Sequence, residues 1–237
     1  AALAADGIPD IAVLLGPNHY GRGSAVALSP DDAWTTPLGN LRTDGEVAES
    51  ILELSRFADV DELPHAREHS IEVQLPFLQY IGGESISIVP ISIAHLNSAD
   101  ALALTEDLGA AIAGALAGRS AVVIASTDLT HYESLSAAQA KDALVMERIL
   151  ALDWQGLIDL VYSRGITMCG AIGVAVERHA EVLKLVHHIG CFAAHELNGV
   201  LVAQVVRAFD GVKEVVVPVV FGHVAQRGTN TALSGHG

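Results

Sequence analysis

The sequence predicts an α/β fold with a mainly parallel or mixed central sheet and helices on both faces. Short apolar runs typical of buried strands alternate along the chain with amphipathic patterns of helical period. This alternation is characteristic of sheets whose strands are connected by helices. Hydrophobic residues make up 51% of the 237 residues, which is enough to build a sizeable core.

The chain before Pro64 is expected to form two strands and one helix. Five apolar residues, Ile11 to Leu15, precede the turn-forming Gly and Pro at 16–17 and indicate a buried strand. A second short strand is expected at 24–28, followed by a loop at 34–42. Asp44 is expected to cap a helix, because its carboxylate accepts hydrogen bonds from first-turn amides. Four apolar residues share one face of this helix: Val47, Ile51, Leu54 and Ala58.

The chain after Pro64 continues with alternating helices and strands. A polar run at 65–72 leads into a helical pattern that reaches Ile81 and is expected to bend at Pro76, because proline interrupts helical hydrogen bonding. The elements expected after it are, in order, a strand at 86–91, a helix capped by Ser98 that ends near Gly118, a strand at 121–126, a helix with a capping-box match at Ser136 and Gln139, a helix from Asp153 to about Gly165, and a helix opened by 168–170 that continues to about Leu185.

The charge and the cysteine content exclude several classes of protein. The formal net charge is -15 without a basic patch, so we do not expect nucleic acid as a partner. The most apolar stretch, 108–127, is interrupted by Gly118 and Arg119, which indicates a helix followed by a strand and no membrane span. Only two cysteines occur, Cys169 and Cys191, and this number suits a protein of the reducing cytoplasm.

Chemically active side chains lie where one predicted element changes into the next. His19 follows the first strand, Asp128 and His131 follow the strand at 121–126, and Cys169 opens a helix. Because the ends of neighbouring parallel strands meet at one sheet edge, we expect these side chains to face one cleft. A thiol at a helix N-terminus is expected to have a lowered pKa. Imidazole together with thiolate suits iron, copper or zinc as a cofactor.

Each candidate also has a structural interpretation. Asp128 and His131 are either an oriented acid–base pair or part of a helix cap, since Thr130 and Glu133 also match a capping box. His69 is a candidate to line the cleft, while the charges of Glu68 and Glu72 are alternatively explained as a solvated first turn. A further cluster has metal-binding residue types, but its spacing matches no established zinc pattern: His187, His188, Cys191, His195 and Glu196.

Several motifs occur in an order that resembles the MEMO family, whose prokaryotic members are called AmmeMemoRadiSam system protein B. The motifs are GPNHY at 16–20, WTTPLGNLRTD at 34–44, EHSIEVQLPFL at 68–78, IVPI at 88–91, STDLTHY at 126–132 and ITMCGAIGV at 166–174. The resemblance covers roughly residues 1–181. It implies a fold similar to that of the class III extradiol ring-cleavage dioxygenases, which hold a non-haem iron. In MEMO-like proteins a cysteine replaces the carboxylate ligand of those enzymes.

The resemblance also implies roles for individual residues. His19 and Cys169 match metal ligands of the family. The catalytic candidates beside the metal are Asp128, His131 and His69. Three further residues are expected to line the same cleft: Asn18, Tyr20 and Glu68.

The sequence departs from the family pattern at both ends. The family's first ligand histidine belongs to a Pro-His-Ala-Gly-Tyr segment that is expected upstream of Ala1, and the pattern is not recognisable after about Leu183. We therefore expect a MEMO-like α/β domain at 1–185 that lacks its N-terminal strand and ligand segment. A divergent segment at 186–237 is expected to pack on the same domain.

The leading functional hypothesis is a MEMO-like metalloprotein of the cytoplasm. It is expected to hold iron(II) or copper, with zinc as an alternative, weakly and through two of three protein ligands, and to act as a redox enzyme on a small molecule. One alternative is a non-catalytic protein that binds a peptide or a partner in the same cleft. The other is an incomplete, non-functional fragment.

Overall fold

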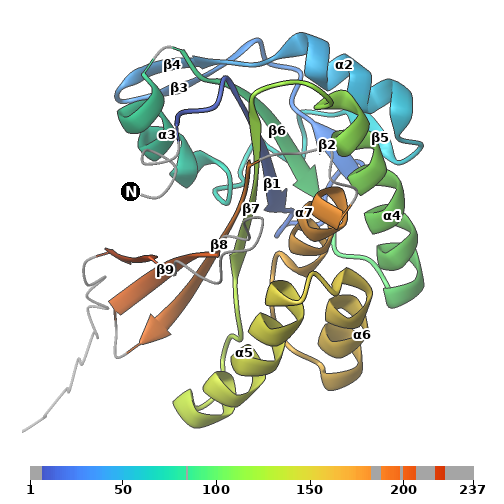
Figure 1. Ribbon diagram of the computed structural model, residues 1–237, viewed down its shortest axis with the longest axis vertical. Coiled ribbons are helices and arrows are strands. Elements are labelled where there is room, and N and C mark those ends of the chain that lie inside the picture. The colour runs from blue at the N-terminus through green and yellow to red at the C-terminus, as the bar shows by residue number, and fades with distance from the viewer. Residues whose placement is uncertain (1–6, 84, 183–187, 198–199, 207–216, 222–237) are drawn as a thin grey trace, which may run out of the picture.

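The computed structural model describes residues 7–83, 85–182, 188–197, 200–206 and 217–221, with side chains described through Ala180. The main sheet has the strand order β10-β9-β8-β7-β1-β6-β2-β5. Figure 1 shows this sheet running through the molecule, with α4 and α7 on one side and α3 on the other. The strands of this sheet are β1 (Ile11–Pro17), β2 (Val26–Leu28), β5 (Ala58–Val60), β6 (Ser87–Ile93), β7 (Ala121–Asp128), β8 (His188–Leu197), β9 (Val200–Val206) and β10 (Val217–Phe221).

Strand β1 lies in the interior of the sheet, where it pairs in parallel with both β6 and β7. All seven of its residues are buried. Its side chains alternate between two hydrophobic clusters, with Val13 and Leu15 in one and Ala12 and Leu14 in the other. A strand that is covered on both faces is almost continuously apolar, and the prediction of a buried strand at 11–15 is confirmed.

Most helices pack on the Val13 side of the sheet. They are α2 (Gly45–Leu54), α4 (Ser98–Ala115), α5 (Leu135–Leu150), α6 (Trp154–Arg164) and α7 (Ala171–Val182). Helix α7 contacts β1, β7 and α4 and buries Val174, Ala175 and Val176 completely. This burial holds the start of α7, and with it Cys169, against the two strands that lead into the candidate site.

The opposite face is covered by a shorter helix and a hairpin. Helix α3 (Leu75–Gly82) follows the single 3-10 turn η1 (Glu72–Gln74) and contributes Leu75 and Leu78 to the second cluster. Leu41, in a β-hairpin formed by residues 33–42, lies in the same cluster. Helices therefore cover both faces of a sheet that mixes parallel and antiparallel pairs, which confirms the predicted fold class.

The stretch 34–42 forms a β-hairpin, so the prediction of a loop was wrong. Its strands β3 (Ala33–Thr36) and β4 (Gly39–Arg42) pair antiparallel, with Trp34 opposite Leu41. The Trp34 indole donates a hydrogen bond to Ser29 Oγ at 3.0 Å, and Leu41 is only 1% exposed. Burial of these apolar side chains against the sheet makes the short hairpin stable.

The first three predicted helices differ from the observed ones at their boundaries. Helix α2 begins after Asp44, as predicted, but Ala58 lies in β5 and Leu54 is 55% exposed, so the predicted apolar face is shorter. Pro76 lies in the first turn of α3 and does not bend it, because a first-turn proline sacrifices no helical hydrogen bond. The cap of α4 is Asn97 in place of Ser98.

The helices after β7 also begin close to the predicted positions. Helix α5 is capped by Ser134, so the capping box predicted at Ser136 and Gln139 was wrong. Helix α6 is capped by Asp153 and ends at a left-handed Gly165, as the sequence predicts. Helix α7 begins at Ala171, so Cys169 lies just before the helix and not in its first turn.

The strands beyond residue 187 continue the main sheet. Strand β8 pairs in parallel with β7, while β9 pairs antiparallel with β8 and β10. The further cluster predicted at 187–196 falls where no side chains are described. Among the described helices, none combines the length and the apolar character needed to cross a membrane.

Candidate functional site

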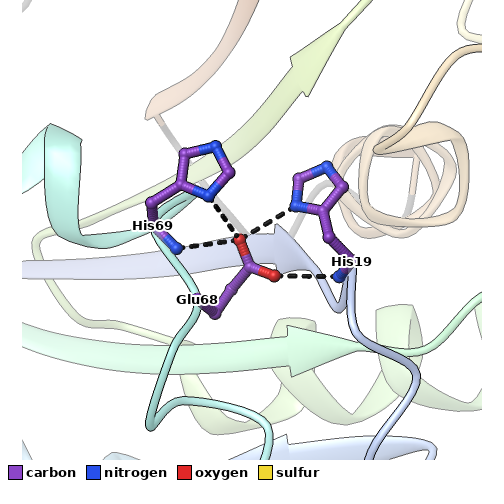
Figure 2. A group of neighbouring side chains, drawn as sticks. All are labelled: His19, Glu68 and His69. Carbon is purple, nitrogen blue, oxygen red and sulfur yellow. Dashed lines mark hydrogen bonds and ion pairs between the residues drawn. The ribbon is translucent and has the colours of Figure 1, made fainter.

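Glu68 connects the two loops that carry the histidines of the candidate site. Its side chain is only 2% exposed. Its Oε2 accepts the backbone N–H of His19 at 2.8 Å, and its Oε1 accepts the Nδ1–H of the same histidine at 2.9 Å. Oε1 also accepts the backbone N–H groups of His69 and Ser70, at 2.9 and 3.0 Å. The carboxylate thus fixes the loop after β1 to the loop before η1 (Figure 2).

These hydrogen bonds keep Glu68 ionised. Burial alone would raise the pKa of the carboxyl group, but the hydrogen bonds from His19, Ser70 and His69 outweigh it and lower the pKa. An ionised carboxylate is an acceptor only, so the Nδ1 atom that faces it carries the proton. In the neutral ring, Nε2 is then the nitrogen without a proton, and a neutral imidazole nitrogen is what binds a metal.

His69 lies beside His19 on the same carboxylate oxygen. Its Nδ1 is 3.3 Å from Glu68 Oε1, and the two imidazole rings stack with centroids 5.2 Å apart and planes at 18°. The side chains of His19 and His69 are 36% and 65% exposed. One side of this group is therefore buried on Glu68 and the other is open to solvent.

The two neighbours of His19 differ in their surroundings. Asn18 is buried, and its Nδ2 donates to the carbonyl oxygen of Arg22 at 2.6 Å, which closes the turn after β1. Tyr20 is 54% exposed. Ser70 Oγ donates to the carbonyl of Pro17 at 3.2 Å and adds a second link between the loops.

Asp128 and His131 form an ion pair after β7. His131 Nε2 lies 3.4 Å from Asp128 Oδ2, and its Nδ1 lies 2.6 Å from the carbonyl oxygen of Thr167. Because both ring nitrogens face acceptors, the protonated ring is favoured. The hydrogen bond to Asp128 accordingly raises the pKa of His131, against the opposing effect of burial. Ser134 caps the following helix, so the cap interpretation of Asp128 does not apply.

Cys169 lies against the end of β7. Its Sγ accepts the backbone N–H of Asp128 at 3.1 Å and lies 3.8 Å from Thr127 Oγ1. Burial raises the pKa of the thiol, while the Asp128 amide acts in the opposite direction. The expected lowering of this pKa is therefore not observed, because Cys169 precedes the helix and is partly shielded from water.

The predicted site residues form two groups at one edge of the sheet. The histidine cluster consists of His19, Glu68 and His69, whose potential ligand atoms lie within 4.8 Å of one another. The cysteine cluster consists of Asp128, His131 and Cys169. β1 and β7 are parallel neighbours, so the loop after β1 and the end of β7 lie at the same edge. The group of potential ligand atoms within 4.8 Å contains His19, Glu68 and His69, and it does not include Cys169.

A small pocket extends this edge next to Cys169. It is lined by the end of β1 at Pro17, by His95 and Tyr162, and by the first residues of α7. The rings of His95 and Tyr162 stack with centroids 5.8 Å apart, and the Tyr162 hydroxyl donates to the carbonyl oxygen of Leu96 at 2.6 Å. Cys169 therefore lines a small pocket that is also lined by the rings of His95 and Tyr162.

Three supporting residues were not identified from the sequence. Ser70 joins the loops at Glu68, Thr127 Oγ1 accepts the backbone N–H of Gly170 at 2.9 Å, and Thr167 holds His131. All three lie within motifs quoted above. Ser70 and Thr127 lie directly beside chosen residues and Thr167 lies two positions before Cys169, and this closeness in sequence is the signal that would have found them.

The comparisons with known proteins agree on one family. A family model described as "Memo-like protein" matches residues 1–206. The chain is 48% identical to a MEMO1 family protein of Methanopyrus kandleri over 170 residues, which are 71% of this chain and 59% of that protein. It is 41% identical to a MEMO1 family protein of Ignicoccus hospitalis over 179 residues, which are 76% and 62% of the two chains. The chain therefore spans about three fifths of the length of these curated relatives.

Proposed function

The chain belongs to the Memo-like protein family, and from this premise we propose that it is a metal-binding protein that uses iron(II) or copper for redox chemistry on a small molecule. We assign His19 and Cys169 as protein ligands. The observation that carries this proposal is the contact between Glu68 and His19 Nδ1. Metal-ligating histidines almost always donate their second ring nitrogen to a carboxylate, a carbonyl or water.

The donor chemistry of the site supports the choice of metal. His19 offers its Nε2, which faces away from Glu68 (Figure 2). Burial raises the pKa of Cys169, but Cys169 Sγ accepts an amide N–H from Asp128, a contact that favours the thiolate and acts against burial. Imidazole and thiolate suit iron, copper or zinc and argue against magnesium or calcium. A bound iron(II) or copper ion supplies Lewis acidity and a redox-active centre.

The neighbouring residues have distinct tasks in this proposal. His131 holds a proton at Nε2 that is shared with Asp128 and donates it to a reacting group, while Thr167 fixes the ring through Nδ1. A positioned imidazole of this kind is a common general acid or base. The exposed Tyr20 contacts the substrate at the rim of the site. Few cysteines, one of them a described free thiol, agree with the cytoplasmic location that we propose.

The test is the metal content of the protein after anaerobic incubation with iron(II) and gel filtration. We expect bound iron in the wild type and a loss of most of it in both His19→Asn and Cys169→Ser. The matched control is Glu62→Gln, an exposed side chain outside the two clusters, which should retain wild-type iron content. Absence of bound iron in the wild type, or iron content unaffected by both ligand variants, would contradict the proposal.

A second candidate function is a binding protein that holds a peptide in the same cleft. It is favoured by two exposed tyrosines, Tyr20 at 54% and Tyr132 at 101% exposure, which flank His19 and His131. Tyr132 also has a left-handed backbone conformation, with φ of 61°, which costs free energy in a non-glycine residue. Peptide binding that persists after metal removal, with no metal-dependent oxygen consumption, would favour this candidate.

A further inference from the structure

Both imidazoles of the histidine cluster have the same orientation relative to Glu68. His19 Nδ1 lies 2.9 Å and His69 Nδ1 lies 3.3 Å from the single oxygen Glu68 Oε1. A carboxylate oxygen repels the lone pair of an unprotonated nitrogen, so this geometry favours the Nδ1–H tautomer in both rings. Figure 2 shows the remaining ring nitrogens pointing away from Glu68 on the same side of the group. In the neutral rings, the two Nε2 atoms are therefore the nitrogens that can bind a metal.

Glu68 itself is poorly suited to bind an ion directly. Its two oxygens already accept three backbone N–H groups and the ring of His19. Its side chain is 2% exposed and lies behind the two rings, whereas His69 is 65% exposed. A ligand role for Glu68 would leave buried amide donors without an acceptor, which is costly. A carboxylate in this arrangement positions the imidazoles and leaves their outer nitrogens free.

We propose that His69 is a metal ligand together with His19, each through Nε2, and that Glu68 is the positioning residue that holds both rings in the Nδ1–H tautomer. This inference rests on the proposed function, because it names a third protein ligand for the ion assigned to His19 and Cys169. Two imidazoles and one thiolate give a three-ligand set that leaves a coordination position open for water or substrate. The set is built entirely from described residues.

The first experiment titrates the metal-free protein with cobalt(II) alone and records affinity and near-ultraviolet absorption. A cobalt–thiolate charge-transfer band reports on Cys169, and its loss in Cys169→Ser tests the proposed function separately. His69→Asn is expected to weaken cobalt affinity by about ten-fold or more while keeping this band. Glu68→Gln is expected to weaken the affinity by about 10–100-fold, as is typical for partners of metal-ligating histidines.

The matched control is Glu72→Gln. Glu72 is an exposed residue of η1, four positions after Glu68, and the substitution makes the same change of charge. Its cobalt affinity should equal that of the wild type. An unchanged affinity in His69→Asn, with the thiolate band present, would overturn the role of His69 while leaving the proposed function intact. No cobalt binding in the wild type would overturn both.

The second experiment needs no metal. Long-range proton–nitrogen NMR correlation on the metal-free, nitrogen-15-labelled protein identifies the tautomer of each neutral histidine. We expect His19 and His69 both to be protonated at Nδ1 in the wild type and in Glu72→Gln, and to lose this common preference in Glu68→Gln. A wild-type His69 protonated at Nε2 would overturn the proposal, whatever the variants bind.

Discussion

At the scale of single residues, His131 shows how the surroundings of one ring set its charge. The ring lies between Asp128 Oδ2 at 3.4 Å and the carbonyl oxygen of Thr167 at 2.6 Å. Only the imidazolium can donate to both acceptors, and the hydrogen bond to Asp128 raises the pKa of His131. Because Thr167 lies two residues before Cys169, this contact also fixes the segment that leads into the thiol.

The first prediction concerns Asp128→Asn. The folded-state pKa of His131 lies above its unfolded value of about 6.5. The paired imidazolium therefore contributes fully to stability below that pH, and the contribution is lost as the pH rises through the folded-state pKa. The substitution should thus lower the free energy of unfolding more at about pH 6 than at about pH 9. Denaturant unfolding at the two values measures the difference.

The control for this prediction is Asp159→Asn, which makes the same change of charge on an exposed residue of α6. It should lack the pH-dependent component. NMR titration of the His131 ring should also give a midpoint above the ordinary histidine value in the wild type and a lower one in Asp128→Asn. Identical pH responses of the two variants would show that the pair is not formed in solution.

Residues close in sequence were predicted more fully than those joined by the fold. The pairing of Asp128 with His131 follows from a spacing of three residues after a strand. The contact of Glu68 with His19 spans 49 residues, and no local pattern specifies which carboxylate meets which ring. The raised pKa of Cys169 was missed for a similar reason. Its main cause is burial by neighbouring elements, which the local sequence does not report.

At the scale of elements, the packing of α7 against β7 determines where Cys169 lies. The residue between Cys169 and the helix is Gly170, and a Cβ atom placed there would lie 2.4 Å from the Ser126 carbonyl oxygen. The Gly170 N–H also donates to Thr127 Oγ1 at 2.9 Å. The close approach of backbone to backbone therefore requires glycine at this position.

The second prediction compares two alanine substitutions at the start of α7. Gly170→Ala should lower the free energy of unfolding by about 2–3 kcal/mol, because the strand carbonyl cannot move without shifting the helix. Gly173→Ala is the matched control, since its new Cβ would meet Leu15 Cβ at an ordinary 3.4 Å. There the change should be within about 1 kcal/mol and favourable to the helix. Equal destabilisation of the two variants would contradict the observed packing of α7.

Helices and strands with a long apolar pattern were predicted well. Elements whose formation depends on contacts with other parts of the fold were predicted less well. The strand at 121–126 and the helix at 153–165 lie close to the observed β7 and α6. The hairpin at 33–42 was missed, because its short strands are stabilised by Trp34 and Leu41 packing on the sheet. Asn97, Ser98, Ser134 and Ser136 are all competent caps. Which of two nearby residues becomes the N-cap depends on the backbone conformation with which the chain enters each helix.

At the scale of the whole molecule, the sheet brings together parts of the chain that are far apart in sequence. Strands β1 and β7 are parallel neighbours, so the loop with His19 and the segment with Cys169 lie at one edge although 150 positions separate them. The alternation of strands and helices predicts this convergence. The antiparallel pairing of β2 with β6 was not specified in advance, because strand direction depends on the path of the connecting loops.

The measurement that tests the central claim most directly is the alkylation of Cys169 with and without added iron(II), followed by peptide mapping. If His19 and Cys169 hold the same ion, iron should slow the alkylation of Cys169 in the wild type by about ten-fold or more, because a bound thiolate is a poor nucleophile. The protection should be lost in His19→Asn, with Cys191 as a reference thiol on the same chain. An alkylation rate of Cys169 that iron leaves unchanged, or equal protection in His19→Asn, would contradict the account.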